Sequence, residues 1–166
     1  WNTILNWDVL ITWSGQLRHT TWNYNYLTLT INGDTENNGI IWWDSSSYMN
    51  RLYIHFKWDV INNGSVNYIY HTYLYGDITN GIDWSWSWTT YIQGTETDGI
   101  RTIIPSENFK PTMYLNGDVE FLWDIDFNFS VYLQDYTLYV DGAKDIYIEY
   151  PITWKVLSSN TIWDGE

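Results

Sequence analysis

The sequence contains no cysteine, a single alanine (Ala143) and three prolines. Without cysteine there is no disulfide, no thiol nucleophile and no cysteine-based metal site, so packing alone must stabilise the fold. Seven lysines and arginines stand against 20 aspartates and glutamates, a formal net charge of −13. Because a negative field repels phosphate backbones and anionic lipids, the charge argues against nucleic acid as a partner.

Long apolar runs are also missing. The longest pure apolar stretch, Ile40–Trp43, has 4 residues, whereas a membrane helix needs roughly 18 or more. We therefore expect no membrane span. The sequence starts at Trp1 rather than at methionine, which is typical of a mature chain after removal of a signal peptide. This favours a secreted protein that is located outside the cell or on its surface.

The chain is rich in aromatic and β-branched residues. Its 166 residues are 45% hydrophobic and 20% aromatic, with 13 tryptophans, which is enough apolar surface for the core of one domain. Tyrosine, tryptophan, isoleucine and threonine favour strands, while helix formers are depleted and no 3.6-residue period is sustained. The composition predicts an all-β protein.

Runs with period-two alternation are separated by turn residues. Asn-Gly-Asp occurs at 32–34 and again at 116–118, and Asn63-Gly64 predicts a tight hairpin. Turn signals that arrive every 8–15 residues are typical of an antiparallel sheet. We therefore predict an antiparallel β-sandwich, jelly-roll-like, with about ten strands. The expected strands cover residues 1–13, 17–31, 48–61, 65–75, 82–93, 100–104, 119–133, 137–140 and 145–157.

The N-terminal segment is the most specific feature. Its alternation predicts one long strand with a single apolar face. That face either joins the chain's own sheet or completes the sheet of a neighbouring copy. The second interpretation divides the chain into a donor strand with its hinge, residues 1–15, and one β-sandwich domain, residues 16–166. The donor face consists of Trp1, Thr3, Leu5, Trp7, Val9, Ile11 and Trp13.

Catalytic motifs are absent from the sequence. His19, His55 and His71 do not have the spacing that places two imidazoles on one metal ion. Asp124 and Asp126 have the two-residue spacing of a carboxylate pair for glycoside hydrolysis, but alternation alone explains them. The acidic loops around Asp34, Asp98 and Asp118 offer oxygen ligands that calcium could take, but none matches the Asp-x-Asp-x-Asp-Gly loop, and turn chemistry alone predicts Asp and Gly there. We expect no catalytic residue, no metal and no cofactor.

Two patterns point to glycans. Trp84, Trp86 and Trp88 alternate with serines, so their indoles share one face of a strand and could form a sugar-stacking platform or part of the core. Asn63 and Asn128 each begin an Asn-x-Ser sequon, which predicts N-glycosylation where the asparagine is exposed on a secreted protein.

A secreted, cysteine-free, all-β chain that begins with an amphipathic strand resembles the donor-strand extracellular filament subunits of archaea. These are the threads and bundling pili related to TasA-type biofilm fibres. The match covers the strand at residues 1–13 and the sequons at Asn63 and Asn128. The resemblance implies a jelly-roll-like sandwich whose N-terminal strand inserts into the next subunit, and some members of the family carry many N-glycans.

The resulting hypothesis is a structural subunit of an extracellular filament that polymerises head to tail with copies of itself. Glycans or cell surfaces are further possible partners. Two alternatives stay open. One is a secreted carbohydrate-binding module or lectin that uses Trp84, Trp86 and Trp88, and the other is a jelly-roll viral coat protein.

Overall fold

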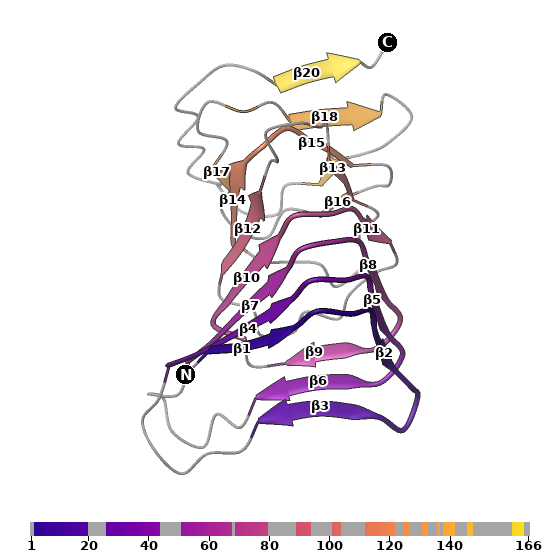
Figure 1. Cartoon of the computed structure of the whole chain (residues 1–166). Helices are drawn as coiled ribbons and strands as arrows, with labels where there is room; N and C mark the ends of the chain where they lie inside the picture. Colours follow the sequence, from indigo (N-terminus) through magenta and orange to yellow (C-terminus); the bar gives the residue numbers. More distant parts are fainter. Residues whose placement is uncertain are drawn as a thin grey trace.

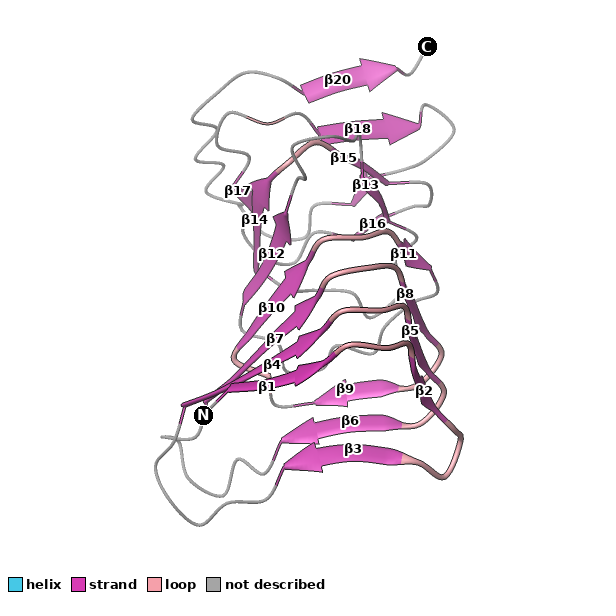
Figure 2. Cartoon of the chain, in the orientation of Figure 1, coloured by secondary structure: helices cyan, strands magenta, loops and turns pink. Residues whose placement is uncertain are grey.

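The computed structural model shows an all-β chain whose strands form stacked parallel sheets (Figure 1, Figure 2). The structure describes residues 2–19, 26–43, 51–67, 69–79, 89–93, 101–103, 112–121, 125–126, 131–132, 136, 138–141, 146–147 and 161–164. Within these ranges every strand pair is parallel. No helix in the described part of the chain is long and apolar enough to cross a membrane.

Sheets A and B are the two large sheets. In spatial order, the strands of sheet A are β1 (Asn2–Leu5), β4 (Tyr26–Ile31), β7 (Arg51–Phe56), β10 (His71–Leu74), β12 (Thr89–Gln93), β14 (Thr112–Asn116) and β17 (Val131–Tyr132). Those of sheet B are β2 (Val9–Ile11), β5 (Thr35–Asn37), β8 (Val60–Asn62), β11 (Ile78–Thr79), β13 (Arg101–Ile103), β15 (Val119–Phe121), β18 (Leu138–Asp141) and β20 (Thr161–Asp164).

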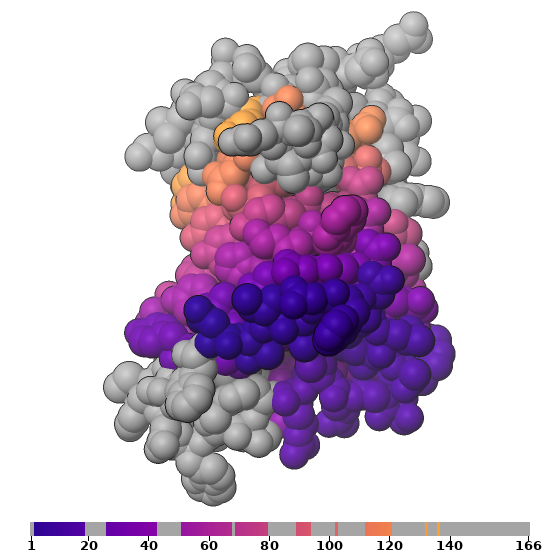
Figure 3. All heavy atoms as spheres, viewed as in Figure 1, coloured from indigo at the N-terminus to yellow at the C-terminus, as the bar shows by residue number. Residues whose placement is uncertain are grey.

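Two smaller sheets complete the described strands. Sheet C contains β3 (Gln16–His19), β6 (Ile40–Trp43) and β9 (Ser65–Asn67), and sheet D contains β16 (Ile125–Asp126) and β19 (Ile146–Tyr147). Each of the first three coils of the chain supplies one strand to A, then one to B, then one to C. The chain is thus a parallel β-helix, in which each coil stacks on the one before it. In Figure 3 the colours of the described residues pass from indigo near the centre of the molecule through magenta to orange toward the top.

Strand register gives the length of each coil. Leu5 pairs with Ile31 and Ile31 with Phe56, so the first two coils are 26 and 25 residues long. Phe56 pairs with Leu74, and Leu74 with Ile92, so the next two coils have 18 residues each. The first of these 18-residue coils still contains β9 of sheet C but has a short connection from β9 to β10, and the second shows no sheet C strand within the described residues. Coil length therefore changes on the side of sheet C, while sheets A and B continue.

The predicted antiparallel, jelly-roll-like sandwich is wrong, because all described sheets are parallel. The extended N-terminal strand is wrong as well. It breaks at residues 6–8 into β1 and β2, which pair with β4 and β5 of the same chain. Short alternating strands separated by Asn-Gly turns fit both architectures, since a β-helix corner also needs a sharp turn. The Asn-Gly sites at 32–33 and 63–64 are corners of coils, not hairpins.

The core fills the space between the sheets. Alternate residues on each strand point inward, as the burial pattern of β4 and β7 shows. Equivalent inward positions stack from coil to coil, so Ile31, Phe56 and Leu74 form one buried column. The largest fully buried side chains are Phe56, Ile31, Ile41, Ile54, Ile69, Leu74, Ile92 and Met113.

Two buried asparagines complete hydrogen bonds at a corner of the β-helix. Asn37 and Asn62 are paired across adjacent coils, and both are fully buried. The Asn37 amide donates to the side-chain oxygen of Asn62, and the Asn62 amide donates to the Gly64 carbonyl at 2.9 Å. These bonds satisfy groups that would otherwise be costly to bury, and they fix the register of the corner after sheet B.

Candidate functional site

The corner between sheets A and B repeats regularly in the first four coils. In each of the first four coils, three residues connect the strand in A to the strand in B, namely residues 6–8, 32–34, 57–59 and 75–77. We call this surface the AB corner. Because successive coils are in register, its three positions form three columns that run along the axis of the β-helix.

The middle column alternates tryptophan with glycine. It contains Trp7, Gly33, Trp58 and Gly76. The indoles are 71% and 61% exposed, although a large aromatic side chain is usually mostly buried. A Cβ at Gly33 would lie 2.4 Å from the carbonyl carbon of Trp7, and a Cβ at Gly76 would lie 2.4 Å from that of Trp58. Glycine is therefore required on the coil that follows each tryptophan.

The third column consists of aspartates, namely Asp8, Asp34, Asp59 and Asp77. Asp8 Oδ1 accepts from the backbone N–H of Asp34 at 3.0 Å, and Asp59 Oδ1 accepts from that of Asp77 at 2.8 Å. Asp77 Oδ1 accepts from the N–H of Thr102 at 2.9 Å. Each of these bonds connects one coil to the next and uses only one carboxylate oxygen. The second oxygen has no hydrogen bond within the described residues, and Asp8, Asp34 and Asp59 are exposed.

The first column supplies amide groups and one cation. Its members are Asn6, Asn32, Lys57 and Tyr75. Asn32 Nδ2 donates to Asn6 Oδ1 at 2.9 Å, so one amide of the pair keeps both N–H groups for other partners. Lys57 Nζ lies 3.4 Å from the centre of the Tyr75 ring, a cation–π contact. The AB corner thus combines indoles, carboxylates and amides on one exposed surface.

A second aromatic surface lies on the outer face of sheet A. Here five rings stack on consecutive coils, and we call them the sheet A stack: His55, Tyr73, Tyr91, Tyr114 and Tyr132. The ring centres are 4.2 Å, 4.8 Å, 5.2 Å and 4.3 Å apart, with interplanar angles of 6°, 9°, 20° and 8°. Each ring therefore covers the face of the next, and stacking stabilises the sheet.

Two histidines and three tyrosines of sheet A have pKa values that are shifted in the direction of the neutral ring. Burial lowers the pKa of His55 and of His71, and the positive charges of Lys57 and Arg51 respectively lower it further. His71 Nδ1 is buried and has no hydrogen-bond partner among the described residues. Burial also raises the pKa of Tyr73, Tyr91 and Tyr114, and neighbouring tyrosines add to that effect. Both directions favour the uncharged rings.

The predicted donor face is divided in the structure. Leu5 and Val9 pack against the core and Ile11 is buried. Trp7 and Trp13 lie at corners instead and are 71% and 79% exposed. Thr3 is also exposed, although its paired residue on β4, Leu29, is buried. Trp1 lies outside the described residues. Thus the structure brings three of the seven positions, Leu5, Val9 and Ile11, to the core and turns two tryptophans outward.

The predicted glycan features are mostly outside the described residues. Trp84, Trp86 and Trp88 lie there, as do Asn128 and Asp124. Asn63 is exposed at the turn after β8, and its Nδ2 donates to Asn38 Oδ1 at 2.8 Å. Its glycosylation stays a prediction.

The structure places two of the three histidines on sheet A and offers no metal site among the residues it describes. His55 belongs to the sheet A stack and His71 packs against Tyr53, with ring centres 5.2 Å apart. No group of three or more His, Cys, Asp or Glu side chains within the described ranges could hold a metal ion. Neither carboxylate columns nor histidines therefore converge on one point.

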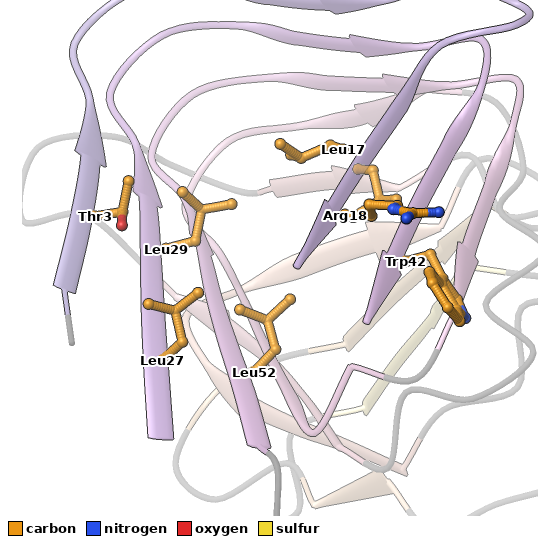
Figure 4. Close-up of a pocket in the computed structure, with 8 residues that line it drawn as sticks. Thr3, Leu17, Arg18, Leu27, Leu29, Trp42 and Leu52 are labelled. Carbon is orange, nitrogen blue, oxygen red and sulfur yellow. The ribbon is translucent and has the colours of Figure 1, made fainter. Parts of the chain in front are cut away.

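A cavity of about 140 Å³ lies between sheets A and C in the first three coils (Figure 4). Leu27, Leu29 and Leu52 line it from β4 and β7, and Leu17 lines it from β3. Its lining is mostly apolar, and Thr3 and Arg18 are the polar residues in it. The guanidinium of Arg18 lies over the Trp42 ring, 5.8 Å from its centre. The cavity therefore has no set of polar groups that would orient a ligand.

No family model, curated protein or solved structure matches the chain. Function must therefore be argued from the surface itself. The sequence interpretation missed the aspartate column and the partnership of Trp7 with Trp58. The signal was present, because Asn-Trp-Asp-Val at 6–9 recurs as Lys-Trp-Asp-Val at 57–60.

Proposed function

We propose that the protein is an extracellular carbohydrate-binding β-helix whose AB corner recognises neutral glycans. The observation that carries this proposal is the pair of exposed indoles, Trp7 and Trp58, beside a column of aspartates. The apolar face of a sugar ring packs on an indole, and its hydroxyl groups donate to carboxylate oxygens.

The sheet A stack fits this role less well. Its rings cover one another at 4.2–5.2 Å, so their faces are not open to a sugar. At the AB corner, glycine separates the two indoles, and the middle coil projects no side chain between them. Charge supports the choice of ligand, because a chain with a net charge of −13 repels polysaccharides that carry uronate or sulfate.

Binding of soluble polysaccharides, measured by affinity electrophoresis and isothermal titration calorimetry, tests the proposal. We expect neutral polysaccharides to retard the protein and acidic ones to leave its mobility unchanged. The W7A/W58A double variant should lose the retardation. Trp13→Ala is the matched control, because Trp13 is 79% exposed but lies outside the AB corner. Equal binding by the double variant and the native protein would overturn the proposal.

A second candidate function is that of a filament subunit. The order of the strands in sheet B favours assembly by end-to-end stacking, without exchange of a donor strand. β1, β2 and β3 lie at one end of sheets A, B and C, and β20 lies at the other end of sheet B. Since every described strand of sheet B runs in the same direction, β20 of one copy and β2 of the next would continue one parallel sheet. Such a contact does not close on itself and would build a filament.

Exposed apolar side chains near this end support the second candidate. Ile4 on β1 is 59% exposed and Leu10 on β2 is 63% exposed. Negative-stain imaging and sedimentation should show filaments for the native chain and monomers for the I4K/L10K variant. Ile61→Lys is the control, since Ile61 lies on the outer face of β8, two coils from the end. A native chain that stays monomeric at high concentration would contradict assembly and leave glycan binding untouched.

A further inference from the structure

We infer that the ligand of the AB corner is an extended, unbranched, neutral polysaccharide that lies parallel to the axis of the β-helix. This inference rests on the proposed glycan binding and adds the direction, shape and linkage class of the ligand. The columns of the corner define the direction. Trp7 and Trp58 lie on the same column, with Gly33 between them, and the aspartate column runs beside them.

The spacing of the two tryptophans along the column indicates the conformation of the polysaccharide. Neighbouring coils are about 4.8 Å apart, so two coils separate the tryptophans by about 10 Å. This is close to the length of two sugar residues in an extended chain with equatorial linkages. In such a ribbon, alternate residues present the same ring face. Residues i and i+2 can therefore stack on Trp7 and Trp58, while residue i+1 passes over Gly33.

In the first four coils an aspartate occurs on every coil, whereas a tryptophan occurs on every second coil. Asp8, Asp34 and Asp59 occupy three consecutive coils, so each sugar of the ribbon meets one carboxylate. Asp8 and Asp59 already hold backbone N–H groups with Oδ1, which fixes their side chains. Their second oxygens remain available to accept from hydroxyl groups. A coiled α-linked chain cannot keep this repeat, because its residues turn away from a straight column.

Calorimetry with two series of oligosaccharides, each two to six residues long, tests the inference. One series is the β-1,4-glucan and the other the α-1,4-glucan. We expect the affinity for β-linked oligomers to rise about tenfold between two and four residues, when a ligand first reaches both indoles. The α-linked series should show no such step.

Single variants test whether Trp58 causes the rise in affinity with oligosaccharide length. Trp58→Ala should lower the affinity for the β-linked hexasaccharide about tenfold and leave the affinity for the disaccharide within about twofold of native. Trp13→Ala should change neither value. If both series bind with no dependence on length, the corner binds glycans but the axial ribbon is wrong. If neither series nor any neutral polysaccharide binds, the proposed function itself fails.

Discussion

The two aromatic surfaces of this β-helix use the same kind of residue in opposite ways. On sheet A, rings on five consecutive coils from His55 onward cover one another, with centres as close as 4.2 Å. At the AB corner, an indole occurs on every second coil and glycine on the coils between. Spacing by one coil hides ring faces and stabilises the sheet, whereas spacing by two coils leaves them free. The spacing of aromatic residues along the axis therefore separates a structural column from a binding column.

The largest effect on stability is expected at Gly33, where the AB corner has no room for a side chain. In Gly33→Ala the new methyl group meets the backbone of Trp7 at 2.4–2.6 Å, which the chain can relieve only by moving two coils apart. We expect a loss of about 3 kcal/mol in the free energy of unfolding together with loss of glycan binding. Urea denaturation measures the first value. Thr12→Ala, at an exposed position outside the AB corner, is the control. A Gly33→Ala protein as stable as native would contradict the corner geometry.

Removing a ring from the middle of the sheet A stack should have the next largest effect. Tyr73 contacts both His55 and Tyr91, so Tyr73→Ala removes two stacked pairs and should lower the free energy of unfolding by about 2 kcal/mol. Glycan affinity should not change. Tyr73→Phe keeps the stacking and should stay close to native in thermal denaturation. A Tyr73→Ala protein that is stable but binds no glycan would reverse the roles of the two surfaces.

Stability should also depend on pH through the groups of sheet A. Burial lowers the pKa of His55 and His71 in the folded state. The unfolded chain therefore binds more protons as the pH falls below the ordinary histidine value of 6.5, and stability decreases there. The raised pKa of Tyr73, Tyr91 and Tyr114 acts in the other direction, so stability also decreases above the ordinary tyrosine value of 10.0.

Thermal melts between pH 4 and pH 11 measure the loss of stability at acidic pH and the loss at alkaline pH. In the H55Q/H71Q variant the loss of stability on acidification should be smaller, while the loss of stability at alkaline pH should not change. A loss of stability at acidic pH that is unchanged in this variant would show that other groups cause it.

The smallest effect on stability is expected at the tryptophans themselves. Trp58 is 61% exposed, and substitutions at such surface positions change the free energy of unfolding by about 0.5 kcal/mol or less. Trp58→Ala should therefore melt within a few degrees of native while glycan binding falls. Differential scanning calorimetry provides the comparison. A large drop in melting temperature would place Trp58 with the sheet A stack as a structural residue.

The sequence was informative about local structure and poor at long range. The sequence predicts strands over residues 17–31 and 48–61, and β4 and β7 lie within those ranges with alternate residues buried, because period two is a local property of a strand. Alternation does not show whether a strand pairs with the next strand through a hairpin or with a strand one whole coil away. Both kinds of pairing produce the same alternation of buried and exposed residues. The repeat that distinguishes them is obscured by coil lengths of 26, 25 and 18 residues.

The candidate site was harder to predict than the core. Trp7 follows the alternation of its neighbours and was assigned to an apolar face, although the chain turns there and points the indole outward. Only the short match between residues 6–9 and 57–60, read with the glycine at 33, indicates a corner. The meaning of that glycine depends on contacts with another coil, which no local pattern records.

The constant length of the AB corner has a consequence for how such a protein can evolve. Three residues join A to B in each of the first four coils, while coil length varies beyond sheet B. Duplication of two whole coils would add another tryptophan, another glycine and two aspartates at the same spacing. A gene could thus lengthen its binding row by copying a segment, without inventing a new interface. Insertions on the side of sheet C would leave that row unchanged.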